Sequence, residues 1–178
     1  MFSLGLVSAS HAGIPLLLKV TKNENQDIRA HFQARNYNRR SGADVLTYSI
    51  QLINAGQTPI KDVEVKWAIL MRARSSTKQK LTEGSSTASL DKMGKFALDT
   101  DPVDIRQIWR SSVSTHSSDV MEEVGHTVEV IVDGKVVASE IKPMDVKPKI
   151  EAARRAEEGA RKAEQAFQTG STRPSSKK

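Results

Sequence analysis

Residues 44–70 read DVLTYSIQLINAGQTPIKDVEVKWAIL and carry the clearest structural signal in the chain. Apolar and polar side chains alternate in residues 46–52. The same alternation returns in residues 63–69, after a short turn that contains Asn, Gly and Pro. A period of two means that one face of each strand is buried while the other faces water. The stretch therefore predicts two adjacent strands of a two-layer β-sandwich, with Trp67 as a large core residue near Tyr48, Ile50 and Val65.

More strands are predicted on both sides of this stretch, at residues 14–20, 28–35, 87–90 and 95–98. Residues 104–110 are predicted to form either a short helix or a strand. Two β-branched runs in residues 126–141 flank Asp133-Gly134, the pair that a type I′ hairpin turn favours. The sequence thus predicts an all-β fold: an immunoglobulin-like antiparallel β-sandwich of about seven to eight strands, followed by a C-terminal helical or disordered tail.

The predicted sandwich occupies residues 13–142. Residues 143–148 hold two prolines and are predicted to be a linker. Residues 149–167 are rich in Ala, Glu, Arg and Lys and predict a helix, whereas residues 168–178 are predicted to be a disordered tail. One helix face carries mostly small residues, at Ala153, Ala156, Ala160, Ala163 and Phe167. Because alanine buries little area, we expect a solvated helix that adds little to folding.

Composition excludes several classes of function. The chain of 178 residues has no cysteine, which removes disulfides, thiolate metal sites and Cys nucleophiles. Of the net charge of +6, residues 149–178 account for +4, so the predicted sandwich is nearly neutral. A nucleic-acid partner is therefore not indicated. No stretch approaches the roughly 20 apolar residues that a membrane-spanning helix needs.

The first twelve residues resemble the end of a secretory signal. A short apolar run at residues 2–7 is followed by Ser10 and Ala12, small residues three and one positions before Gly13. We expect residues 1–12 to be the remnant of a signal peptide, the alternative being an ordinary N-terminus. Export would place the protein in the periplasm, on the outer-membrane surface or outside the cell; the alternative location is the cytoplasm.

Neither a catalytic site nor a cofactor site is predicted. The sequence lacks the common nucleotide-binding, hydrolase and metalloprotease motifs, so we expect no catalytic residues, no cofactor and no enzymatic activity. His31, His116 and His126 are not at metal-ligand spacing, and we expect them to face solvent without binding a metal. The serines and Asp119 beside His116, and the aspartates of residues 99–104, are explained by ordinary loop and turn chemistry.

One basic cluster within the predicted sandwich is a candidate binding site. It consists of Arg29, His31, Arg35, Arg39 and Arg40. On a strand Arg29, His31 and Arg35 would share a face, because all three positions are odd-numbered. That face could bind an acidic glycan, phosphate or nucleic acid. No aromatic residue interleaves on that face, so base stacking is not supported. The alternative is a solvated strand face.

The segment YSIQLINAGQTPIKDVEVKWAIL, with the apparent signal remnant and the Lys/Ala/Glu-rich tail, resembles secreted immunoglobulin-like proteins of Akkermansia-type Verrucomicrobia. Some of these proteins are linked to type IV pilus gene clusters. The resemblance implies an exported, non-enzymatic module that binds a protein partner at the envelope or pilus, or has a structural role there. It supplies no functional residues. A carbohydrate- or polyanion-binding domain that uses residues 29–40 is the alternative.

Overall fold

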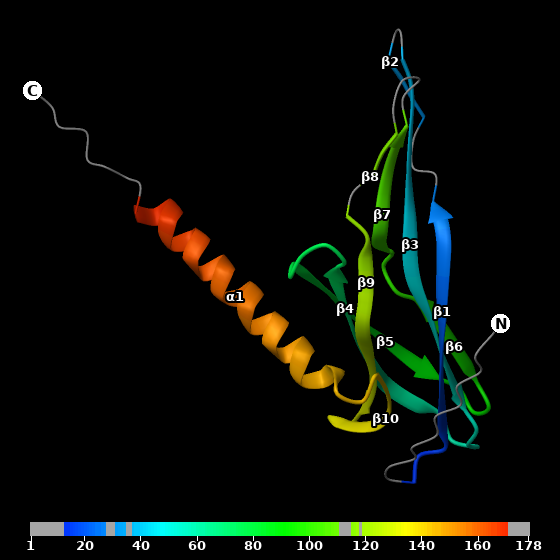
Figure 1. The fold of residues 1–178 in the computed structure, drawn as a ribbon. Helices are drawn as coiled ribbons and strands as arrows, with labels where there is room; N and C mark the ends of the chain where they lie inside the picture. Colours follow the sequence, from blue (N-terminus) through cyan, green and yellow to red (C-terminus); the bar gives the residue numbers. More distant parts are fainter. Residues whose placement is uncertain (1–12, 28–30, 35–36, 111–114, 118, 171–178) are drawn as a thin grey trace, which may run out of the picture.

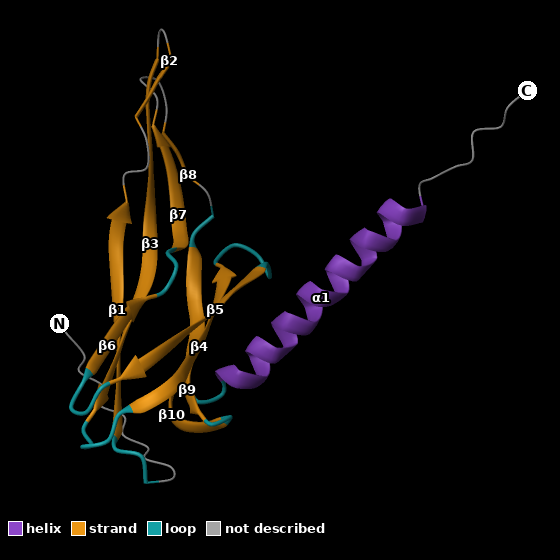
Figure 2. Ribbon diagram, turned by 180° about the vertical axis from the view of Figure 1, so that it is seen from behind, coloured by secondary structure: helices purple, strands orange, loops and turns teal. Residues whose placement is uncertain are grey.

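A computed structural model describes residues 13–27, 31–34, 37–110, 115–117 and 119–170, and it shows two packed antiparallel sheets with one long helix (Figures 1 and 2). The elements in chain order are β1 (Leu16–Asp27), β2 (His31–Ala34), β3 (Tyr37–Asn54), β4 (Ile60–Ala73), β5 (Gln79–Leu90), β6 (Lys95–Asp99), β7 (Val103–Arg110), β8 (Thr115–Ser117), β9 (Met121–Val132), β10 (Lys135–Lys142) and α1 (Val146–Gly170).

The first sheet has the order β1–β3–β7–β8, and β3 also pairs with β2 and β6. The second sheet has the order β10–β9–β4–β5. This arrangement confirms the predicted β-sandwich. Residues 104–110, for which a helix was the other expectation, belong to strand β7. The ten labelled strands include β2, whose four residues lie within the strand predicted at residues 28–35, and β8, whose three residues lie in a stretch that was expected to be a loop.

Alternation along the central strands builds the core between the sheets. Ile50 and Leu52 of β3 face Val63 and Val65 of β4, and all four are fully buried. Trp67 packs against the same cluster but is only partly buried, which corrects the expectation of a fully enclosed core tryptophan. Its indole ring lies over Gly84 of β5, where a Cβ atom would come within 2.3 Å of the ring.

The hairpin between β9 and β10 confirms the predicted type I′ turn. Val132 pairs with Lys135, and the two residues between them, Asp133 and Gly134, have φ angles of 51° and 73°. Positive φ at both central positions is the requirement that Asp-Gly meets with least strain.

Helix α1 packs on the outer face of the second sheet rather than following a free linker. Val146, Ile150 and Ala153 are buried against Ala68 and Leu70 of β4. The expected linker at residues 143–148 is therefore corrected, because the helix begins at Val146 and Pro148 falls in its first turn, where proline is tolerated. Of the four alanines on the predicted face, Ala153 is buried and the other three are exposed. Residues 154–165 are exposed, and the helix points away from the sandwich (Figure 1).

Candidate functional site

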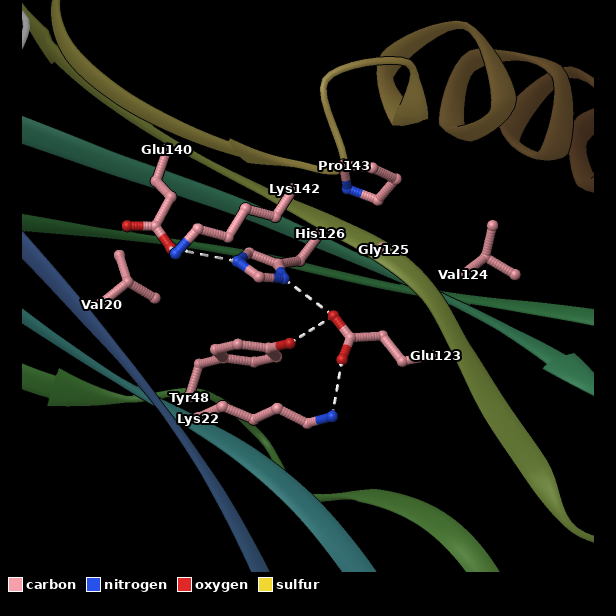
Figure 3. A pocket seen from close by; sticks show the side chains of 10 residues that line it. All are labelled: Val20, Lys22, Tyr48, Glu123, Val124, Gly125, His126, Glu140, Lys142 and Pro143. Atoms are coloured by element: carbon pink, nitrogen blue, oxygen red, sulfur yellow. Dashed lines mark hydrogen bonds and ion pairs between the residues drawn. The ribbon is translucent and has the colours of Figure 1, made fainter. Parts of the chain in front are cut away.

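Six polar side chains meet at the edge of the sandwich where β1 and β10 lie side by side (Figure 3). They line an open cleft of about 380 Å³. The six are Lys22 of β1, Tyr48 of β3, Glu123 and His126 of β9, and Glu140 and Lys142 of β10. We call them the β1–β10 cluster. It draws on both sheets, so its contacts bridge the two layers.

An irregularity in β9 places Glu123 and His126 on the same face. Residues three apart on a regular strand point to opposite faces. Here Gly125 pairs with Leu70 but Glu123 pairs with Met71, so Val124 is an extra residue in the ladder. Gly125 is required at this point, because a Cβ atom there would lie 2.4 Å from the backbone oxygen of Lys142. The bulge thereby turns both Glu123 and His126 toward the space between the sheets.

The position of Tyr48 follows from the way β3 changes partners. Strand β6 pairs with β3 up to Ser49, and β7 takes over from Leu46, which leaves Tyr48 in the gap. Thr100, between β6 and β7, fills this gap. Its hydroxyl accepts from the Tyr48 backbone nitrogen and its own nitrogen donates to the Tyr48 carbonyl, each at 2.9 Å. The tyrosine is thus fixed with its ring centroid 4.3 Å from that of His126.

Glu123 is the centre of the β1–β10 cluster. Its Oε1 accepts hydrogen bonds from the hydroxyl of Tyr48 and, at 2.8 Å, from His126 Nδ1. Its Oε2 lies 2.9 Å from Lys22 Nζ. Burial alone would raise the pKa of Glu123, but these three donors outweigh burial and lower the pKa to about 2. Burial and the bond to Glu123 raise the pKa of Tyr48, so its phenol stays protonated.

His126 lies between two carboxylates. Its Nε2 is 3.4 Å from Glu140 Oε1, on the side opposite to Glu123. Burial would lower the pKa of His126, but the two glutamates outweigh this effect and the pKa is raised. For Glu140 burial would raise the pKa, whereas His126 and Lys142, whose Nζ lies 2.9 Å away, lower it. The imidazole therefore lies between two carboxylates that favour its protonated form.

Together with the neighbouring Glu24, which lies 2.8 Å from Lys22 Nζ, the β1–β10 cluster is balanced in charge when His126 is protonated. Lys22, His126 and Lys142 then oppose Glu24, Glu123 and Glu140. Each charge is held by an opposite charge, and Glu140 Oε2 is the one buried carboxylate oxygen of the cluster with no hydrogen-bond partner in the described part of the chain. This arrangement can cross-link the sheets, because Lys22 and Tyr48 come from one sheet and Glu123 from the other.

The geometry gives little support to catalysis or metal binding here. A carboxylate with a pKa of about 2 is a weak base at neutral pH, and both ring nitrogens of His126 already face carboxylate oxygens. Within the residues that the structure describes, no group of three or more His, Cys, Asp or Glu side chains is arranged to hold a metal ion.

The predicted basic cluster lies on other parts of the fold. Arg29 and Arg35 fall outside the described residues. His31 on β2 pairs in register with Arg40 on β3, and Arg40 pairs on its other side with Arg110 on β7. Arg39 is opposite Phe32. The register therefore places three basic residues in one row across three strands, and none of them belongs to the β1–β10 cluster.

Sequence reasoning missed the β1–β10 cluster, and its expectation for His126 was wrong. His126 was expected to face solvent, but only 7% of its side chain is exposed. A signal was present in the run EEVGHTV, where Gly125 interrupts a strand pattern and glutamates stand beside apolar residues. Glycine within a strand marks a bulge or a close backbone approach, and either one changes which side chains face the core.

Comparisons with known proteins identify no family for this chain. No protein-family model matches it, and no curated protein matches it. Several solved structures are similar to it, and two of them show the low scores of this similarity. The X-ray structure of Northeast Structural Genomics Consortium target SoR45 has 10% identity, covers 75% of this chain and 91% of that chain, and gives a TM-score of 0.33. A crystal structure from Akkermansia muciniphila has 9% identity, covers 78% of this chain and 76% of that chain, and gives a TM-score of 0.31. Similarity at these scores supports no inference about ancestry or function.

Proposed function

We propose that this chain is an exported, non-enzymatic β-sandwich that serves as a protein-binding or structural module at the cell envelope. The observation that carries the non-enzymatic part is the state of the β1–β10 cluster. Tyr48 and His126 both donate to Glu123, and this bonding lowers the pKa of Glu123 and raises that of Tyr48. Such a cluster is suited to hold two sheets together. Sandwiches of this kind commonly present edge strands and end loops to partners.

The proposed location rests on sequence features. Ser10 and Ala12 have the spacing that signal peptidase requires before Gly13, and the absence of cysteine suits an oxidising compartment. An association with pili follows only from the sequence resemblance and is part of the same proposal. No helix in the described residues is both long enough and apolar enough to cross a membrane.

Fractionation of the native cell tests this proposal. Protein from the envelope and extracellular fractions should begin near Gly13 when its N-terminus is sequenced. Full-length protein that starts at Met1 and is confined to the cytoplasmic fraction would contradict export and, with it, the envelope role.

A polyanion-binding role is a second candidate, favoured by the row of His31, Arg40 and Arg110. Three basic residues in register could follow the repeating charges of an acidic polysaccharide. The double change Arg40→Ala and Arg110→Ala should then lower the salt concentration at which the protein elutes from immobilised heparin. Arg72→Ala, which removes an exposed arginine on β4, is the matched control. Equal elution of the two variants would remove this candidate.

A further inference from the structure

Strand β5 forms a free edge of the second sheet. It pairs with β4 on one side, and no described strand pairs with its other side. The backbone of its outer side is therefore available to another strand, which is the usual way in which a sheet edge binds protein.

Two hydrogen bonds show which β5 residues point outward. Ala73 N donates to Lys78 O at 2.8 Å, which makes residues 73 and 78 a hydrogen-bonded pair of the β4–β5 hairpin. Because such pairs alternate in antiparallel sheets, Leu81, Glu83, Ser85 and Thr87 direct their backbone groups away from β4. In agreement, Leu81 N donates to Glu157 Oε1 of α1 at 3.3 Å.

Helix α1 protects only the first half of this edge. Glu157 accepts the hydrogen bond from the backbone nitrogen of Leu81, and Arg154 forms an ion pair with Glu83. The second half, residues 84–90, reads GSSTASL and has no charge and no proline. Natural sheets normally protect exposed edges with charges, prolines, bulges or very short strands.

Three other described edge strands carry such protection. Strand β10 has a bulge between Val136 and Ala138 and is followed by Pro143. Strand β6 is only five residues long. Strand β1 follows Pro15 and carries Lys22, a charged residue of the β1–β10 cluster. Residues 84–90 of β5 differ from all three, so this segment is the best candidate for strand pairing.

We infer that β5 pairs with β5 of a second copy of this chain, antiparallel and about a twofold axis at Ser86. This inference rests on the proposed function and names a partner for it. In that register Ser85 is opposite Thr87 and Glu83 is opposite Ser89, so no like charges meet. Opposed Ser and Thr side chains are favourable cross-strand pairs. A segment that is complementary to itself fits the isologous contact of a twofold dimer.

Sedimentation velocity over a range of protein concentrations tests the inference. The wild type should show a dimer whose fraction rises with concentration. Thr87→Pro should remain monomeric, because proline removes an outward N–H while leaving the bonds to β4 intact. Thr87→Ala, which keeps that N–H, should dimerise like the wild type. A wild type that is monomeric throughout, or a Thr87→Pro variant that dimerises as well as the wild type, would overturn the inference.

A cysteine substitution tests the register and does not depend on how proline is tolerated. Two Ser86 residues on the axis would form a non-hydrogen-bonded pair with Cα atoms about 4.5 Å apart, within the range of a disulfide. The natural chain has no thiol, so Ser86→Cys can form only the intermolecular bond. Under mild oxidation Ser86→Cys should form disulfide dimers much faster than Ser89→Cys. Equal or reversed rates would overturn the register. Export of the native protein, measured separately, would show whether the proposed function fails with it.

Discussion

Replacing Glu123 with glutamine should separate the role of its charge from that of its shape. The carboxylate receives hydrogen bonds from Tyr48, His126 and Lys22, and its side chain is only 16% exposed. Glutamine preserves the size of the side chain but removes the negative charge that faces two cations. The variant therefore leaves the imidazole of His126 with one carboxylate instead of two.

The expected loss of stability can be worked from the structure. The folded-state pKa of about 2, compared with an ordinary value of 4.5, corresponds to about 3 kcal/mol, since one pKa unit is about 1.4 kcal/mol. Breaking a buried ion pair by removing one partner costs about 3–5 kcal/mol. Lys22 is 42% exposed and should contribute little of this. We expect Glu123→Gln to lower the free energy of unfolding by about 3 kcal/mol at neutral pH.

The sign of the pH dependence follows from the lowered pKa. The stabilisation is fully present above the ordinary value of 4.5 and is lost as the pH falls toward 2. The difference between wild type and Glu123→Gln should therefore narrow over that interval. Equilibrium urea unfolding at several pH values, monitored by tryptophan fluorescence, measures this difference in unfolding free energy. Glu122→Gln is the control, because Glu122 is 43% exposed and pairs with a surface arginine, so its loss should stay below about 1 kcal/mol. Equal losses for the two variants would refute the reasoning.

The other predictions concern pH, packing and the helix. The unfolding free energy of the wild type should decrease as the pH rises from about 6.5 through the raised pKa of His126, and His126→Gln should flatten that slope in urea titrations at several pH values. Gly84→Ala should cost about 1–3 kcal/mol, because the new methyl group would overlap the ring of Trp67; a smaller cost in a Trp67→Leu background would identify the ring as the cause. A chain that ends at Lys147 loses buried residues of α1 and should be less stable by about 2 kcal/mol or more, whereas one that ends at Glu158 should unfold like the full chain in thermal scans.

Local patterns in the sequence were sufficient to predict the sandwich. Alternation in residues 46–52 and 63–69 sets which side chains face the core, and Asp133-Gly134 fixes a turn by its own backbone preference. These signals need no knowledge of distant residues. The prediction of a linker before the helix failed because it depended on a distant contact. Pro148 suggests a break, but it lies in the first turn of α1. The helix is held there by Val146 and Ile150, on either side of Pro148, which are buried against β4.

The β1–β10 cluster depends on contacts between distant parts of the chain. Lys22 and Glu140 are separated by most of the chain, and they come together only because β1 and β10 form adjacent edges of two different sheets. The face on which Glu123 lies also depends on the bulge at Val124, which shifts the alternation by one residue. A single glycine in the strand is a weak signal for such a shift. The sequence therefore predicts strands at these positions without predicting which polar groups meet.

The most direct test of the structural role of the β1–β10 cluster is an NMR titration of His126, with the His126→Gln variant used to assign its imidazole signal. Two carboxylates hold the ring, so its pKa should lie above the ordinary value of 6.5. A pKa at or below 6.5 would contradict the account. It would mean that the imidazole is neutral and free to accept a proton, and that the cluster is not the charge-balanced cross-link between the sheets described above.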